Sequence, residues 1–231
     1  MKVHRVADAA AGTQLAATLF AKAADIAADC PVGLATGRTM DGVYAALARN
    51  GFVPGFTDAF ALDEYVGVAP NHKNSYAREL REKFAGSLGW SGTLHLPGHG
   101  QYSGEEGAGL FEQVLRTVGP LSVQLLGLGV NGHIAFNEPG AAFASRTRTV
   151  ELQPETLTAN SVYFDDPALM PTHAVTQGLA TIAQARMLLA LVFGPSKQEA
   201  LTKALWHPDS STPLAAFAGH EDLVLITDLE C

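Results

Sequence analysis

The chain has 231 residues, of which 47% are hydrophobic and 16% charged, and this length can bury a substantial core. Its net charge of −8 argues against a nucleic-acid-binding protein, because phosphate backbones attract basic surfaces. No apolar run approaches the length that spans a membrane, and Cys30 and Cys231 are too few for a disulfide framework. We therefore expect a cytoplasmic protein that binds neither nucleic acid nor membranes.

Short apolar runs alternate with helical patterns along the chain. The predicted elements, in chain order, are a helix through Leu15 and Ile26, a strand at 31–35, a helix at 41–49, a strand at 56–62, helices at 75–84 and 105–118, strands at 121–128 and 187–193, a helix at 196–205 and a strand at 223–227. This alternation predicts an α/β fold, with a mostly parallel, Rossmann-like sheet and helices on both faces, in a single domain over residues 1–231.

The segment from Gly33 to Thr39 follows a predicted strand and precedes a predicted helix. Glycines let backbone N–H groups approach an anion, and a helix N-terminus adds partial positive charge. The hydroxyls of Thr36 and Thr39 and the guanidinium of Arg38 supply further donors. The pattern fits an anion-binding loop, and it fits equally well a plain strand–helix turn in which Thr39 caps the helix.

Two further segments at strand ends carry acid–base groups. Asp63 follows the strand at 56–62, where partial desolvation would raise its pKa and suit it to proton abstraction; an exposed strand-end acid is the alternative. The segment 131–140 places His133 near Glu138, a carboxylate that can orient the imidazole ring and stabilise its protonated form. A structural histidine in a turn is the alternative, and a metal site lacks a third ligand.

Three other polar residues are ambiguous. Lys197 follows Gly-Pro-Ser at the start of a predicted helix, which suits an anion but also a solvated surface lysine. His95 and His99 share a Pro/Gly-rich stretch, and we expect both to be solvated.

In a parallel sheet the ligand site lies beyond the carboxyl ends of the strands, where the polar and glycine-rich segments of this chain fall.

These segments and others between them follow the order of motifs in one enzyme family. The matching pieces are GLATGRT at 33–39, LDEYVGV at 62–68, NSY at 74–76, LGLGVNGHIAFNEPG at 126–140, SRTRTVEL at 145–152, TANS at 158–161 and GPSK at 194–197. Together they resemble the glucosamine-6-phosphate deaminase family, within the larger group that includes the 6-phosphogluconolactonases. The resemblance runs from about residue 30 to residue 205, and GHIAFNEPG is its most specific part.

The resemblance implies an enzyme that isomerises and hydrolytically deaminates glucosamine 6-phosphate to fructose 6-phosphate and ammonia, without a metal or organic cofactor. By analogy, Asp63 would move a proton between C2 and C1 of the open-chain sugar, and His133 would open the ring by moving a proton at the ring oxygen. Asn131 and Glu138 would set the orientation and protonation of His133. We expect a monomer or small homo-oligomer whose substrate phosphate is bound by Thr36, Gly37, Arg38, Thr39 and Lys197.

The chain departs from the family pattern at several positions. Asn131 stands where many members carry Asp, and Val162 stands where the family usually has a phosphate-binding arginine. Arg38 occupies a usually small position, and our hypothesis is that it replaces the lost cation. Ala141 and Ala142 replace a serine pair of the allosteric members, so we expect hyperbolic kinetics.

Three alternatives remain open at this point: an enzyme acting on galactosamine 6-phosphate, a lactonase, and a non-catalytic sugar-phosphate sensor. Retention of Asp63 together with His133 and Glu138 favours isomerisation and deamination over lactone hydrolysis. The acidic net charge argues against a sensor that forms part of a DNA-binding regulator.

Overall fold

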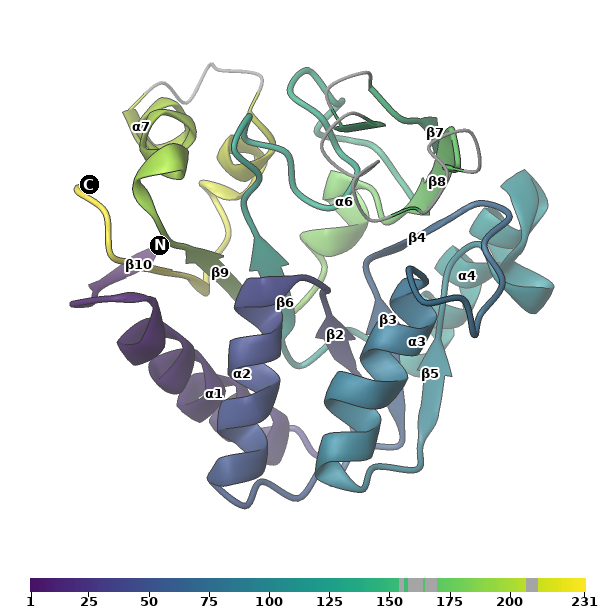
Figure 1. Ribbon diagram of the computed structural model, residues 1–231, viewed down its shortest axis with the longest axis horizontal. Coiled ribbons are helices and arrows are strands. Elements are labelled where there is room, and N and C mark those ends of the chain that lie inside the picture. The colour runs from purple at the N-terminus through teal and green to yellow at the C-terminus, as the bar shows by residue number, and fades with distance from the viewer. Residues whose placement is uncertain (154–155, 158–163, 165–169, 207–211) are drawn as a thin grey trace.

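The centre of the protein is a seven-stranded sheet, seen in a computed structural model that describes residues 1–153, 156–157, 164, 170–206 and 212–231 (Figure 1). Its strands pair in the order β1-β10-β9-β6-β2-β3-β5, and every pairing is parallel. The strands are β1 (Lys2–Arg5), β2 (Val32–Leu34), β3 (Asp58–Ala61), β5 (Thr93–His95), β6 (Gln124–Gly127), β9 (Leu188–Val192) and β10 (Leu223–Thr227).

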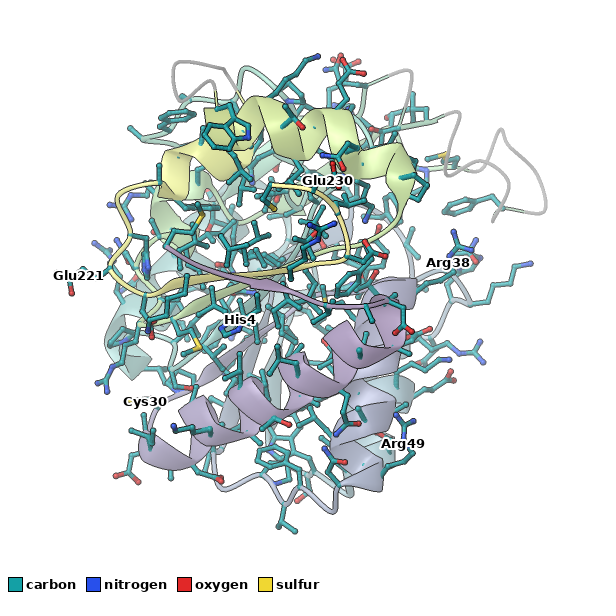
Figure 2. The ribbon with its side chains drawn as sticks, turned by 90° about the vertical axis from the view of Figure 1, so that its left-hand side faces the viewer. His4, Cys30, Arg38, Arg49, Glu221 and Glu230 are labelled. Carbon is teal, nitrogen blue, oxygen red and sulfur yellow. The ribbon has the colours of Figure 1, made fainter. Side chains whose placement is uncertain are left out.

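Helices cover both faces of this sheet. Helix α1 packs against α2 and against β9 and β10, whereas α7 lies on the other side of the strands (Figure 2). No helix among the described residues has the length and apolar character needed to cross a bilayer. The helices are α1 (Ala9–Ile26), α2 (Arg38–Arg49), α3 (Tyr76–Leu80) with the π-helical segment η1 (Arg81–Gly86), α4 (Gly104–Val118), α6 (Leu179–Ile182) and α7 (Gln198–Trp206), with short 3₁₀ turns η2 (Gly100–Tyr102), η4 (Pro195–Lys197) and η5 (Pro213–Phe217).

A second, antiparallel sheet stands above the carboxyl end of the first. It consists of β4 (Asp63–Tyr65), β8 (His173–Thr176) and β7 (Arg148–Glu151), in the order β4-β8-β7. Only Leu62 separates β3 from β4, so the chain leaves the large sheet and enters the small one within one residue. This change of sheet places Asp63 at the junction between the two.

The predicted α/β class, with a mostly parallel sheet and helices on both faces, is confirmed. Strands β1 and β5 and the small antiparallel sheet were not predicted. The expectation that His95 and His99 are solvated is wrong. His95 is buried between the hydroxyl of Tyr102 and the carboxylate of Asp58, and Nε2 of His99 lies 3.1 Å from a carboxylate oxygen of Glu64.

Candidate active site

A cavity of about 650 Å³ opens at the carboxyl ends of the central strands. The segments that follow β2, β3 and β6 form its walls, together with the end of η4. Of the candidate residues, only Glu138 does not line the cavity, and it lies directly behind one that does. The candidates that line it are Thr36, Gly37, Arg38, Thr39, Asp63, Asn131, His133 and Lys197.

One end of the cavity is formed by the turn between β2 and α2. Gly37 is the N-cap of α2 and has a φ of +103°, a conformation that favours glycine, and no side chain caps this helix. The alternative in which Thr39 caps the helix is therefore wrong. The backbone N–H groups of Arg38 and Thr39 form no hydrogen bond with any described residue. Free amides at a helix N-terminus are suited to bind an anion.

Two cations lie beside these amides. Arg38 is exposed, projects from the N-terminal end of α2 (Figure 2), and forms no ion pair with a described residue. Burial, followed by the charge of Arg38, lowers the pKa of Lys197, and the carboxylate of Asp228 opposes this shift. Like charges held close together repel each other, so a bound anion between them would relieve the repulsion. This end of the cavity therefore has the chemistry of a phosphate site.

Asp63 also lines the cavity and is only 8% exposed. Burial raises its pKa to about 8, with further contributions from the negative charges of Glu64 and Glu79. Asp63 is held on β4, where it pairs with Thr176 of β8. A carboxyl group that exchanges its proton near neutral pH is matched to general acid–base work.

His133 belongs to a hydrogen-bonded relay with Asn131 and Glu138. Its Nδ1 lies 2.7 Å from Oδ1 of Asn131, and Nδ2 of Asn131 donates to Glu138 over 2.7 Å. The hydroxyl of Thr156 donates to the second oxygen of Glu138 at 2.6 Å. An amide oxygen only accepts, so Nδ1 of His133 carries the hydrogen and Nε2 keeps its lone pair. Asn131 thus fixes the tautomer of His133, and Glu138 fixes Asn131.

The environment also sets the protonation of this histidine. Burial lowers the pKa of His133, the negative charge of Glu138 raises it, and the positive charge of Lys197 lowers it again. The net effect is a lowered pKa, so the ring is neutral near pH 7. A neutral ring with a free Nε2 can accept a proton from a sugar hydroxyl and return it to another oxygen.

Tyr76, Thr156 and Gly129 are among the lining residues that were not predicted as members of the site. Tyr76 and Thr156 line the cavity, and Tyr76 belongs to the NSY motif that the sequence contains at 74–76. Gly129 lies under the ring of His133, and a Cβ at this position would approach Cε1 of the ring to 2.3 Å. The second glycine of the sequence LGLG at 126–129 therefore allows the backbone to pass beneath the imidazole ring. Val162 and the TANS segment lie outside the described residues.

The sequence profile of the glucosamine-6-phosphate isomerases/6-phosphogluconolactonase family matches residues 5–225. The chain belongs to this family.

Named relatives of this family match over nearly the whole chain. The glucosamine-6-phosphate deaminase of Staphylococcus haemolyticus is 35% identical, over 99% of this chain and 97% of its own. That of Rhodopirellula baltica is 38% identical, over 85% of this chain and 81% of its own. The solved structure of a monomeric glucosamine-6-phosphate deaminase superposes with a TM-score of 0.91 at 34% identity, covering 98% of this chain and 97% of that one.

The family also includes lactonases of the same fold. A 6-phosphogluconolactonase from Shewanella baltica superposes with a TM-score of 0.74 at 18% identity, over 99% of this chain and 97% of its own. Likeness at this identity shows the fold alone. Deaminases and lactonases therefore share this fold, and the side chains of the site distinguish the two reactions.

Proposed function

We propose that this protein is a glucosamine-6-phosphate deaminase, which converts glucosamine 6-phosphate and water to fructose 6-phosphate and ammonia. The observation that carries the proposal is the joint presence, in one cavity, of a carboxyl group with a pKa near 8 and a neutral histidine of fixed tautomer. Isomerisation needs the carboxyl group to move a proton between carbon atoms and the histidine to move a proton between oxygen atoms. The relatives named as deaminases support the same reaction.

Ring opening is the role of His133. Nε2 takes the proton of the anomeric hydroxyl and delivers it to the ring oxygen as the bond between C1 and that oxygen breaks. The imidazolium formed in between is stabilised by Glu138, whose carboxylate oxygen lies 3.9 Å from Nδ1. Asn131 holds the ring in position during the transfer.

Isomerisation and deamination follow at the wall that holds Asp63. Its carboxylate removes the proton from C2 of the open-chain sugar, and the resulting carboxylic acid returns a proton to C1. A second proton passes from the amino nitrogen to the C1 oxygen, so that C2 is then bonded to nitrogen as an imine and C1 carries a hydroxyl. Water adds to the imine, and ammonia leaves to give the ketone of fructose 6-phosphate. The carboxyl group must ionise to begin this cycle, so the elevated pKa of Asp63 makes the step pH-dependent.

The phosphate is bound, in this proposal, by the side chains of Arg38 and Lys197, the hydroxyls of Thr36 and Thr39, and the free N–H groups of Arg38 and Thr39 in the turn formed at Gly37. Arg38 supports the charge-replacement hypothesis because it lines the cavity, lies close enough to depress the pKa of Lys197, and has no carboxylate partner among the described residues. Arg38→Ala is expected to raise KM by about tenfold or more, which corresponds to a loss on the order of 1.4 kcal/mol. An unchanged KM would remove Arg38 from the phosphate site.

The decisive experiment measures fructose 6-phosphate and ammonia together, from glucosamine 6-phosphate, for wild type and Asp63→Asn. Equal release of both products by wild type and loss of both in the variant supports the proposal. Turnover of galactosamine 6-phosphate or 6-phosphogluconolactone with no turnover of glucosamine 6-phosphate would refute it.

Two further points belong to the proposal. We expect the enzyme to act as a monomer with hyperbolic kinetics, as suggested by its likeness to a monomeric deaminase.

A cytoplasmic location is supported by two free cysteines, Cys30 and Cys231, since reducing compartments keep cysteine thiols from forming disulfides.

A further inference from the structure

A carboxylate from α3 binds the backbone of the phosphate loop. Oε1 of Glu79 accepts the N–H of Gly37 at 2.7 Å, although the two residues are 42 positions apart in the sequence. Glu79 is half-buried and does not line the cavity, whereas Gly37 does. The N–H of Gly37 is therefore occupied by Glu79 and is not available to a ligand in the cavity.

A second bond holds the same loop. The hydroxyl of Tyr44, which is fully buried on α2, donates to the carbonyl of Ala35 at 2.6 Å. Tyr44 and Glu79 thus bind the loop at positions 35 and 37, on either side of Thr36. Arg38 and Thr39 follow immediately, and their N–H groups have no partner among the described residues. The two anchors fix the direction of the peptide planes just before the free amides.

Helix α3 is in turn attached to the strand that carries Asp63. Glu64 is completely buried, and its Oε2 accepts the hydroxyl of Ser75 and the N–H of Ala77, both at 2.8 Å. These bonds hold the first turn of α3 against β4. The short helix α3 therefore contacts the phosphate loop through Glu79, and its N-terminal turn contacts β4, the strand that carries Asp63.

The negative charge of Glu79 disfavours the binding of an anion nearby, whereas its hydrogen bond to Gly37 attaches the loop. A carboxylate near a phosphate site repels the ligand, and the acids Asp41 on α2 and Glu64 on β4 raise the pKa of Glu79 as well. Burial is the largest cause of that rise, and only Gly37 and Lys83 oppose it. A neutral side chain at this place would avoid the repulsion but would also leave the loop unattached.

We propose that Glu79 is a positioning residue that holds the phosphate loop in its binding conformation through the N–H of Gly37. This inference rests on the proposed function for the identity of the substrate, but the anchoring itself can be tested with inorganic phosphate alone. Glu79→Gln keeps an acceptor oxygen without the charge, and Glu79→Ala removes both. Glu82→Ala is the matched control, because Glu82 lies one turn away and pairs with Arg78 at the surface.

The test measures the Kd of inorganic phosphate by calorimetry for wild type and the three variants, and KM and kcat for glucosamine 6-phosphate. Glu79→Ala should weaken phosphate binding and raise KM by about fivefold, the equivalent of one hydrogen bond, with kcat within about twofold of wild type. Glu79→Gln and Glu82→Ala should bind phosphate within about twofold of wild type.

Other results overturn the proposal. Tighter phosphate binding by Glu79→Ala would mean that the carboxylate competes with the ligand and does not position the loop. Equal weakening by the alanine and glutamine variants would assign the effect to charge, and a wild type that does not bind phosphate would remove the anion site. A wild type that binds phosphate but does not deaminate glucosamine 6-phosphate refutes only the proposed function, and the effect of the variants on Kd still decides the role of Glu79.

Discussion

Replacing Asp63 by Asn should stabilise the protein in a pH-dependent way. The carboxyl group is buried and has a pKa of about 8 in the folded state, against 3.8 for an ordinary aspartate. Between about pH 4 and pH 8 the folded chain keeps a proton that the unfolded chain has lost. Stability contributed by this group is therefore full below pH 4 and falls as the pH rises to 8. An amide cannot ionise, so the variant escapes this loss.

The magnitude follows from the difference between the two pKa values. About 4 pH units at 1.36 kcal/mol each give an upper bound of about 5 kcal/mol, which for a chain of this size is roughly 10–20 °C in Tm. Urea unfolding of wild type and Asp63→Asn at pH 5 and pH 9 measures the effect. The advantage of the variant should grow as the pH rises from 5 and level off above about pH 8.

The matched control is Asp25→Asn, which changes an exposed carboxylate on α1. All other titrating groups are shared by the proteins, so their contributions cancel in the comparison. Parallel stability curves for wild type and Asp63→Asn would refute the reasoning, because they would show that Asp63 ionises as easily in the folded chain as in the unfolded one.

Three further predictions concern the same cavity. Wild-type kcat/KM should rise about tenfold from pH 7 to pH 9, as the ionised fraction of Asp63 grows from about one-eleventh to ten-elevenths; a flat profile would contradict its role as base. Glu138→Gln removes the charge that raises the pKa of His133, so this pKa, followed by NMR of the imidazole protons, should fall further; an unchanged or higher value would show that Glu138 does not act on the ring. Gly129→Ala should displace the ring of His133 and lower kcat by about a hundredfold or more, with phosphate Kd unchanged; normal kcat would show that the ring does not need its present position.

The central strands could be predicted from sequence because they are buried on both sides. Strands β9 and β10 are buried at every position and appear as continuous apolar runs. Strand β1 was missed because it lies at the edge of the sheet and exposes all four residues, Lys-Val-His-Arg. The small sheet was missed because β4 pairs with β8 more than a hundred residues later, and no local pattern records such pairing.

The sequence indicated which residues belong to the candidate site, but it did not indicate most of the contacts between them. The candidates at Asp63 and His133 came from residue types at strand ends and from the motifs around them. The bond between Glu79 and Gly37 was not foreseen, because it joins a helix surface to a loop far away in the chain. The burial of His99 against Glu64 was missed for a similar reason: a Pro/Gly-rich stretch is usually exposed, and only tertiary packing covers it here.

The change of sheet at Leu62 places Asp63 and the turn after β2 on separately supported parts of the chain. The proposed phosphate loop follows β2 of the large sheet, whereas Asp63 pairs with β8, which pairs in turn with β7; both strands come from the segment 148–176. Insertions or substitutions in that segment can shift the carboxyl group relative to a phosphate that stays in place. A change in the chemistry at Asp63 would then not require any change in the strands of the large sheet.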